Sequence, residues 1–277
     1  MNKTIKTRIF ILGLLIINSC FALAEDTLIM SAPPRETLND GKLQYEITAS
    51  FLSQILGKPV KYEHPANWLN YQSNMRHDKY DIVFDGPHFA SWRMVHLGHD
   101  MLVKLPGKLQ FHLLTAANNN QINSADDLIG KKICGISPPN LSTLSVLAYY
   151  KNPVRQPLIK GVKGGMGKVY TTFKTGACEA LVLRTAFYSK KLKDVDRKNL
   201  KILYTSPAMP NQVISASKRL TPDEKSRLQV ALVSEDGVQA TKPTLKRFGG
   251  KASAFIPATA KEYEGYNNLL EGVIFGW

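Results

Sequence analysis

Apolar positions along the chain form short runs and four-residue repeats, which predicts strands separated by helices. The clearest repeat places an apolar residue at every fourth position, at Leu43, Ile47, Phe51 and Ile55. With Leu52 and Leu56 beside it, we interpret this repeat as the buried stripe of an amphipathic helix that ends at Gly57. Apolar runs bounded by proline, glycine or polar residues predict strands. These runs lie at 27–32, 60–63, 80–86, 108–116, 131–136, 179–183, 200–205 and 212–217.

Strands that alternate with helices predict βαβ units and a mostly parallel sheet. The number of strands exceeds what one sheet holds comfortably, so we predict two α/β lobes. Two further helix starts carry capping boxes, one at Thr221–Glu224 and one at Thr259–Glu262. The chain contains no internal repeat and no low-complexity segment.

The N-terminus has the pattern of a signal peptide rather than of a folded element. Three cations precede the apolar run IFILGLLII, and Ala-Leu-Ala follows at 22–24. We therefore expect residues 1–24 to be removed and the mature chain to begin near Glu25. A second interpretation takes INSC as a lipoprotein box with Cys20 as the acylated residue. Asn18 fits that box poorly, so plain export is favoured.

The charge of the mature chain favours anionic partners. The full chain has 36 Lys and Arg against 22 Asp and Glu, a net charge of +14. The signal segment carries three of these cations and no acid, which leaves +11. Such an excess favours small anionic ligands or contact with an anionic surface. Nucleic acid is excluded as a partner because the chain is exported and its lysines are scattered.

Two cysteines, Cys134 and Cys178, remain after removal of the signal segment. An oxidising compartment favours a disulfide between them. Each also lies at or beside a predicted strand, where a buried free thiol behaves as a small apolar side chain. The sequence leaves these two alternatives open.

Polar groups gather at three predicted strand ends, where ligands bind in open α/β sheets. These ends read SAPPRET (31–37), FDGPHFASW (84–92) and GISPPNLSTLS (135–145). In the third, Ser142, Thr143 and Ser145 begin a helix whose first N–H groups attract oxyanions. Capping of that helix by Asn140 or Ser142 is the alternative. Capping needs only one such residue, so the cluster favours a ligand.

The second strand end adds a carboxylate and a histidine. Asp85 precedes Gly86 and His88, and it would bind a ligand cation or cap the next helix. Arginines near strand ends are candidates because a guanidinium binds an oxyanion through two hydrogen bonds. Arg35 and Arg184 are better placed for this than Arg93.

Other chemical templates fail. The run GGMGK at 164–168 lacks the spacing of a phosphate loop, and the chain has no G-x-S-x-G elbow. Four histidines, His88, His96, His99 and His112, have no carboxylates or thiolates at metal-ligand spacing, so we predict neither a metal nor a cofactor. Four aromatic residues favour core packing over a pocket wall: Trp68, Tyr71, Phe89 and Trp92.

Three segments resemble the periplasmic phosphate, phosphite and phosphonate-binding proteins of ABC transporters, which have the type 2 periplasmic-binding fold. They are YDIVFDGPHFASW, DLIGKKICGISPPNLSTLS and VYTTFKTGACEALVL. The resemblance implies two lobes, 25–110 with 208–277 and 111–207, joined by two crossover strands. It also implies a ligand loop at Ser142 and Thr143. The chain departs from the family where Gly164-Gly165-Met166 replaces a Ser-His pair.

These observations predict a periplasmic, monomeric solute-binding protein and not an enzyme. It would close on a small anionic or zwitterionic solute and deliver it to an ABC transporter permease. A sensory subunit of a membrane signalling protein is one alternative, and an exported enzyme using Asp85 and His88 is another. The predicted ligand-binding residues are Pro34, Arg35, Asp85, Gly86, His88, Asn140, Ser142, Thr143 and Arg184.

Overall fold

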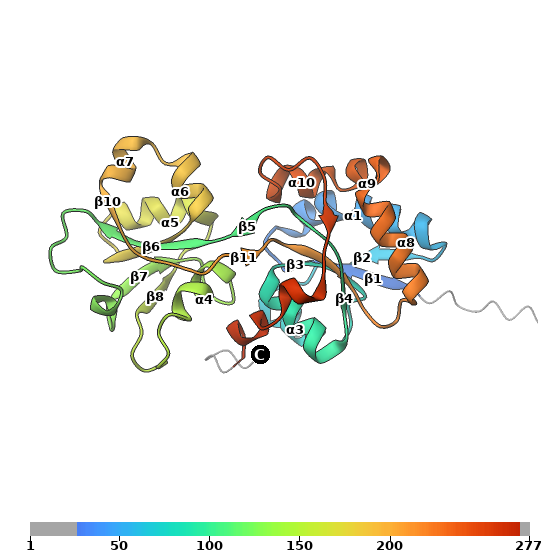
Figure 1. Cartoon of the computed structure of the whole chain (residues 1–277), viewed down its shortest axis with the longest axis horizontal. Coiled ribbons are helices and arrows are strands. Elements are labelled where there is room, and N and C mark those ends of the chain that lie inside the picture. The colour runs from blue at the N-terminus through green and yellow to red at the C-terminus, as the bar shows by residue number, and fades with distance from the viewer. Residues whose placement is uncertain (1–26, 272–277) are drawn as a thin grey trace, which may run out of the picture.

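The computed structural model describes residues 27–271, which form two lobes joined by extended segments (Figure 1). Each lobe has a central sheet with helices on both faces, which confirms the predicted two-lobed α/β fold. The predicted signal segment, 1–24, and Cys20 lie outside the described residues. Within 27–271, no helix combines the length and apolar character needed to cross a membrane.

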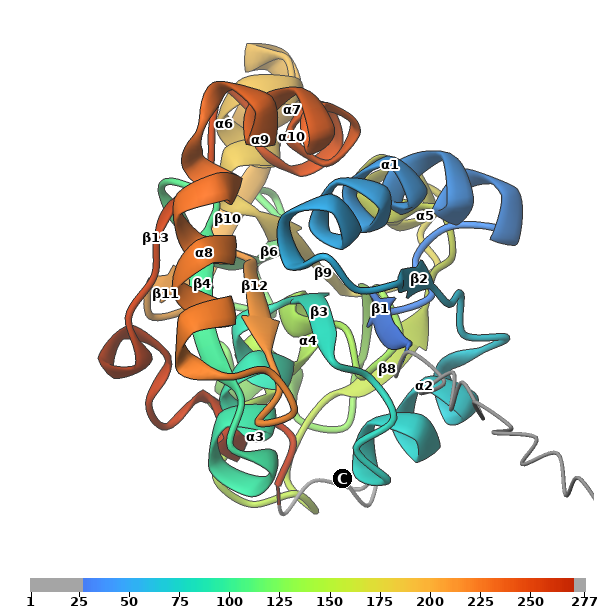
Figure 2. The same ribbon diagram turned by 90° about the vertical axis from the view of Figure 1, so that its right-hand side faces the viewer.

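The first lobe is built on a six-stranded sheet with the order β13-β4-β12-β3-β1-β2. Its strands are β1 (Leu28–Ser31), β2 (Val60–Tyr62), β3 (Ile82–Asp85), β4 (Asp100–Lys104), β12 (Val213–Ala216) and β13 (Ile256–Pro257). Its helices are α1 (Leu38–Leu56), α2 (Trp68–Arg76), α3 (Pro87–Leu97), α8 (Pro222–Val233), α9 (Glu235–Ala240) and α10 (Lys242–Phe248), followed by the 3-10 turns η2 (Ala260–Tyr263) and η3 (Tyr266–Leu269). Figure 2 shows α1 and α3 on opposite sides of this sheet.

The second lobe is built on a five-stranded sheet with the order β10-β6-β9-β7-β8. Its strands are β6 (Phe111–Ala116), β7 (Lys132–Gly135), β8 (Leu158–Gly161), β9 (Ala180–Arg184) and β10 (Leu200–Thr205). Its helices are η1 (Asp126–Leu128), α4 (Leu141–Leu147), α5 (Gly165–Lys174), α6 (Thr185–Lys191) and α7 (Asp194–Lys198). Neighbouring residues of β6 face opposite sides, so Leu113 and Leu114 belong to separate cores.

Both sheets are mixed, but most of their strands run in one direction, four of six in the first lobe and four of five in the second, which agrees with the predicted mostly parallel sheets. In the first lobe, β1 pairs in parallel with β2 and β3, whereas β12 runs antiparallel to β3 and β4. In the second lobe, β6 runs antiparallel to β9 and β10. The antiparallel strands adjoin the connections between the lobes. These connections carry the chain directly between sheets, without the helical crossover that a parallel pair needs.

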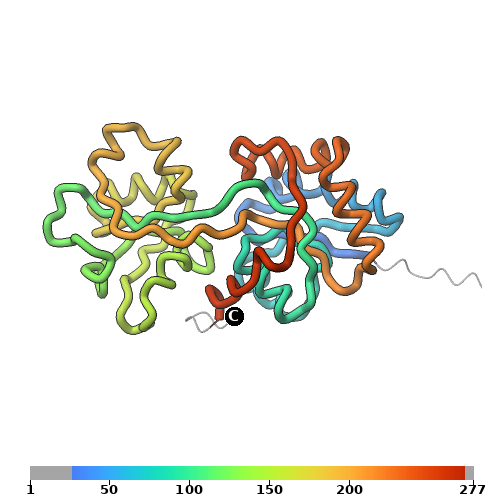
Figure 3. Tube along the Cα trace, viewed as in Figure 1, coloured from blue at the N-terminus to red at the C-terminus, as the bar shows by residue number. Residues whose placement is uncertain are grey.

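Two extended segments connect the lobes, as the sequence predicted. They run next to each other in Figure 3 and meet in a small antiparallel ladder between β5 (Lys108–Leu109) and β11 (Met209–Pro210). The chain therefore leaves the first lobe and returns to it at neighbouring positions. Such paired connections are suited to a hinge because few residues link the two bodies.

The buried stripe of α1 differs from the predicted one. Leu43 is 78% exposed and Ile47 is 52% exposed, whereas Tyr45 and Leu52 are fully buried against the first sheet. Leu56 is also buried, and Phe51 and Ile55 pack against the same core, so the predicted stripe is confirmed in the second half of α1. It is wrong at Leu43 and Ile47, where Tyr45 and Thr48 are buried instead.

A disulfide joins Cys134 to Cys178, which resolves the two alternatives that the sequence left open. Cys134 lies in β7, and Cys178 lies just before the neighbouring strand β9. Both residues are buried in the second lobe, in the core beneath α5. The bond therefore ties two adjacent strands of the second sheet.

Candidate functional site

A cavity of about 180 Å³ lies between the two lobes and is called here the cleft cavity. Residues of both lobes line it, and none of these lining residues, all within 27–271, is acidic. They are Pro33, Arg35, Trp68, Gly86, His88, Phe89, Leu109, Phe111, Pro139, Asn140, Leu141, Arg184, Gln212 and Phe248. The wall thus combines two arginines with aromatic and aliphatic side chains, which is a typical composition for a small-molecule site.

Two arginines face the cleft cavity, one from each lobe. Arg35 follows β1, and Arg184 ends β9 and caps α6. The Nε atom of each is buried and has no hydrogen-bond partner among residues 27–271. Burial lowers the pKa of Arg184. A pair of cationic donors without a carboxylate in the same cavity favours an anion.

Aromatic rings hold the guanidinium of Arg35 in place. Its central carbon lies 4.6 Å from the ring centre of Phe248 and 5.5 Å from that of Phe84. Its Nη2 donates to the carbonyl oxygen of Phe84 at 3.4 Å. Burial opposes the charge, but Tyr45 and the carboxylate of Glu36 outweigh it and raise the pKa of Arg35. The side chain therefore stays charged and in a defined orientation.

His88 connects the two lobes across the cleft cavity. Its Nε2 donates to the carbonyl oxygen of Pro139 at 3.0 Å, and its Nδ1 has no partner among residues 27–271. Burial lowers the pKa of His88 to about 4, so the ring is neutral at neutral pH. Gly86 makes room for this ring, because a Cβ there would lie 3.0 Å from the imidazole Cε1.

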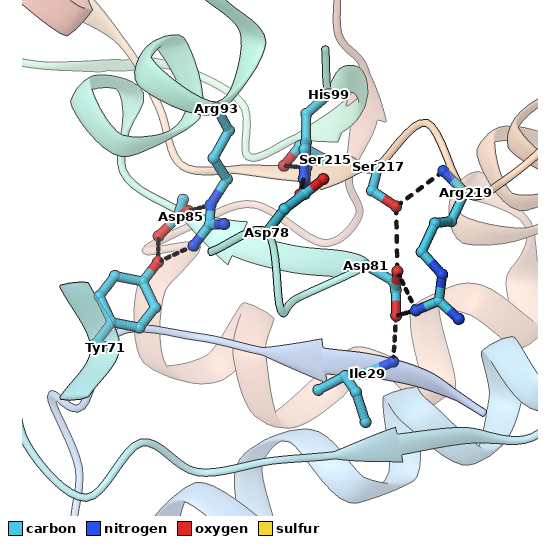
Figure 4. Close-up of polar contacts among 10 residues, drawn as sticks. All are labelled: Ile29, Tyr71, Asp78, Asp81, Asp85, Arg93, His99, Ser215, Ser217 and Arg219. Atoms are coloured by element: carbon cyan, nitrogen blue, oxygen red, sulfur yellow. Dashed lines mark hydrogen bonds and ion pairs between the residues drawn. The ribbon is translucent and has the colours of Figure 1, made fainter. Parts of the chain in front are cut away.

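Asp85 does not line the cleft cavity but forms a fully buried ion pair (Figure 4). It accepts from Arg93 Nε at 2.8 Å and from the Tyr71 hydroxyl at 2.5 Å. Burial opposes the charge of Arg93, but Tyr71 and Asp85 outweigh it and raise its pKa. The structure thus gives Asp85 its hydrogen-bond partners inside the first lobe, and His88 is not among them.

The hydroxyl groups of the third strand end are used inside the second lobe. Ser142 Oγ donates to Asn140 Oδ1 at 2.7 Å, and Thr143 Oγ1 donates to the Ile136 carbonyl oxygen at 2.5 Å. Asn140 is the N-cap of α4 and accepts from the Ser142 N–H. Asn140 lines the cleft cavity, whereas Ser142 and Thr143 are buried behind it. Their role toward a ligand stays a prediction.

Five of the nine predicted ligand-binding residues share the cavity wall: Arg35, Gly86, His88, Asn140 and Arg184. Pro34 lies beside it, and its neighbour Pro33 lines it. Sequence reasoning missed Gln212, whose Oε1 is buried without a partner among the described residues, and Phe248. Gln212 lies in the second connection between the lobes, directly before the apolar strand β12. This position is the one sequence signal that would have indicated it as a ligand-binding residue. Phe248 ends a helix of the far C-terminal part and carries no such signal.

The histidines do not assemble into a metal site, and no group of three or more metal-binding side chains occurs within residues 27–271. His96 pairs with Glu271 at 2.6 Å near the surface. His99 is buried, beside Ser215 and 3.6 Å from Asp78 (Figure 4). His112 contacts Thr205 in the second lobe.

A second, larger hollow of about 480 Å³ lies between α4 and η3. Leu144, Leu147, Tyr204 and Met209 line it, with Lys151 as its charged group. It holds none of the unpartnered polar atoms found within residues 27–271. The cleft cavity is therefore the stronger candidate for specific recognition, because its unpartnered donors and acceptors need a ligand.

Comparisons with known proteins identify the family of the chain. Residues 30–263 match the sequence model of a family described as the periplasmic substrate-binding protein of phosphonate ABC transporters. The phosphate-import protein PhnD of Mycolicibacterium smegmatis is 20% identical over 279 residues, covering 89% of this chain and 85% of that protein.

Two solved structures share the fold. PhnD1 from Prochlorococcus marinus, in complex with methylphosphonate, has a TM-score of 0.62 at 18% identity, covering 88% of this chain and 96% of that chain. XAC2383 from Xanthomonas citri, bound to ATP, has a TM-score of 0.69 at 13% identity, with coverages of 88% and 95%. At these identities the likeness concerns the fold alone.

Proposed function

The chain belongs to the family of periplasmic substrate-binding proteins of phosphonate ABC transporters, and from this premise we propose that it captures a small phosphonate-like anion in the cleft cavity. The single observation that carries the proposal is the pair of unpartnered arginine Nε atoms, one from each lobe, in one cavity. Each guanidinium offers donors that match the oxygens of a tetrahedral anion.

Closure of the lobes would follow from binding. We take residues 25–110 with 208–277 as one ligand-binding lobe and 111–207 as the other. An anion held by Arg35 and Arg184 contacts both lobes only when they are close, so it shifts the population toward the closed form. The β5–β11 ladder is the natural hinge.

The closed protein would deliver its ligand to a membrane permease, as a monomer exported to the periplasm. Catalysis is no part of the proposal, because Asp85 is held by Arg93 and Tyr71 and is not available to His88 as an acid–base partner. Aromatic and aliphatic walls around the arginines suit an organic substituent on the anion.

Titration calorimetry with methylphosphonate, phosphate and acetate tests the binding step. We expect a phosphorus oxyanion to bind the unaltered protein and Arg184→Gln to weaken it about 10- to 100-fold, because charge-assisted hydrogen bonds are lost. Arg35→Gln should weaken it similarly. Arg155→Gln is the matched control, since Arg155 is an exposed arginine of the second lobe outside the cleft cavity.

The proposal fails if no anion binds, or if the Arg184 and Arg155 variants bind equally well. Crosslinking of the ligand-loaded protein to membranes tests delivery. Recovery of an ABC permease supports it, whereas recovery of a signalling kinase in its place would overturn delivery while leaving capture intact.

A further inference from the structure

His88 lines the cleft cavity and carries an unpartnered hydrogen-bond acceptor. Its Nε2 lies 3.0 Å from the Pro139 carbonyl oxygen, which can only accept, so the ring proton is on Nε2. A neutral imidazole then has a lone pair on Nδ1. That atom is buried and unpartnered among residues 27–271, in a side chain that is only 3% exposed. The cavity wall therefore contains an acceptor that needs a donor.

The surroundings keep this ring neutral. Burial lowers the pKa of His88 to about 4, and the effect outweighs the Pro139 carbonyl and the carboxylate of Asp85. The charge of Arg35 acts in the same direction as burial. Arg184 is the other charged residue of the cavity wall. At neutral pH, Nδ1 thus carries a lone pair and no proton.

Two contacts define where the ring lies. The ring of Phe89 is 4.1 Å from it, measured between centroids. On another side is Gly86, where a Cβ would lie 3.1 Å from Nδ1. This spacing is tighter than ordinary van der Waals contact, so any larger residue at 86 would displace the imidazole. The backbone of Gly86 has an ordinary extended conformation, and the close approach alone accounts for glycine there.

The cavity therefore makes two different demands on a ligand. Arg35 and Arg184 need acceptor oxygens, whereas Nδ1 of His88 needs a donor. A sulfonate offers acceptors only, and so does a fully deprotonated phosphonate. A singly protonated phosphonate offers both, because one of its oxygens retains a proton. A lone pair that faces a bare anionic oxygen is left unsatisfied, which disfavours binding.

Resting on the proposed function, we propose that His88 makes the cleft cavity selective for oxyanions that retain one O–H proton, with Nδ1 accepting the hydrogen bond from that proton. His88 is on this view a specificity-determining residue. The arginines supply attraction for any small oxyanion, and His88 separates phosphonates and hydrogen phosphate from sulfonates of the same size.

Calorimetric titration of methylphosphonate and methanesulfonate, two ligands of nearly equal shape, tests this. We expect methylphosphonate to bind about tenfold tighter or more, as a buried acceptor without a donor costs at least that much in affinity. The preference should decline as pH rises through the second pKa of methylphosphonate, which removes its last proton. Methanesulfonate affinity should not change over the same range.

Variants separate this role from a structural one. His88→Phe keeps a ring in place and removes the acceptor, so it should abolish most of the roughly tenfold preference for methylphosphonate over methanesulfonate. Gly86→Ala displaces the ring without altering it and should have the same selective effect, which keeps the test open if His88→Phe does not fold. Arg184→Gln is the contrasting variant, because it should weaken both ligands and preserve their ratio.

The outcomes distinguish this inference from the proposed function. If both ligands bind equally well and Arg184→Gln weakens both, the anion site stands and selection by His88 is overturned. The same holds if the preference survives in both the His88 and the Gly86 variants. If neither ligand nor any other phosphorus oxyanion binds, the proposed function itself fails, and this inference with it.

Discussion

The two lobes share one architecture but differ in how their cores are held and in their charge. The first lobe buries an ion pair, Asp85 with Arg93, beneath its sheet. The second lobe has a disulfide instead, which joins Cys134 in β7 to Cys178 just before β9. Residues 111–207 carry fifteen Lys and Arg against five Asp and Glu, an excess of ten, whereas the remaining described residues have eighteen against fifteen.

The same architecture can therefore be stabilised by a buried ion pair in one lobe and by a disulfide in the other. A buried charge pair makes the first lobe sensitive to loss of either partner. A covalent link makes the second lobe sensitive to reduction. The cationic excess is concentrated in the second lobe, so the field that attracts an anion is asymmetric about the cleft cavity.

The largest expected effect is in the first lobe. Arg93→Met would leave the carboxylate of Asp85 buried without its cation, and we expect unfolding free energy to fall by about 3–5 kcal/mol. Urea denaturation measures it. Arg227→Met, at an exposed arginine of α8, is the control and should cost less than about 1 kcal/mol. If the double variant Asp85→Asn/Arg93→Met regains much of the lost unfolding free energy, the unpaired charge of Asp85 caused the loss. If Arg93→Met loses no more unfolding free energy than the control, the ion pair does not stabilise the first lobe as proposed.

The next effect is in the second lobe. Cys134→Ala with Cys178→Ala opens a link between residues 44 apart, and we expect a loss of about 2–4 kcal/mol. Dithiothreitol should lower the stability of the unaltered protein by a similar amount. The double variant should not respond to the reductant. If the unaltered protein has the same unfolding free energy with and without the reductant, the disulfide does not stabilise the second lobe.

Acid should act mainly on the first lobe. The unfolded His88 binds a proton near pH 6.5, whereas the folded one does so only near 4, because burial lowers its pKa to about 4. Between these values the unfolded state binds more protons, so stability falls as pH falls, by up to about 3 kcal/mol. Burial lowers the pKa of His99 in the same direction.

Urea denaturation at several pH values between 7.5 and 4.5 measures this acid effect. His88→Phe should have a shallower dependence on pH than the unaltered protein. His112 is the histidine of the second lobe whose pKa is lowered by burial, and His112→Phe provides the comparison. An unchanged slope in His88→Phe would exclude the ring as the acid-sensitive group.

The smallest effect concerns the charge difference. Lys190, Lys191 and Lys193 are exposed on and just after α6, the helix that begins at Arg184. Changing all three to Ser should leave unfolding free energy within about 0.5 kcal/mol and slow anion association a few-fold at low salt. Stopped-flow fluorescence of Trp68, on the cavity wall, measures the rate. Lys42→Ser and Lys61→Ser in the first lobe are controls; equal slowing there would refute a local field.

The sequence was sufficient for the architecture because strand and helix periods are local properties. The alternation of short apolar runs with helical repeats predicted two α/β lobes, and glycines and prolines marked the strand ends. The antiparallel strands β6 and β12 were not predicted, since their direction depends on how the chain returns between sheets. The α1 stripe was predicted correctly at Leu52 and Leu56 and wrongly at Leu43 and Ile47, because Tyr45 and Thr48 are buried in their place.

The cavity was only partly predictable because polar residues have several uses. Arg35, His88 and Arg184 line it, and each stood at a predicted strand end. Asp85 stood there too, but Arg93 and Tyr71 arrive from other elements to bind it. Hydroxyls such as Thr143 satisfy nearby carbonyl oxygens, which sequence cannot distinguish from facing a ligand. Gln212 and Phe248 become neighbours of Arg35 only through folding.

The order of strands in the first sheet has a consequence for how the chain matures. β12 lies between β3 and β4, yet it follows the whole second lobe in sequence. A chain that emerges from its N-terminus thus completes the second sheet first, while the first sheet still lacks an inner strand. Until residues beyond 212 are available, β3 and β4 of the first lobe lack the strand that joins them. The lobe that begins the sequence is therefore the last to be finished.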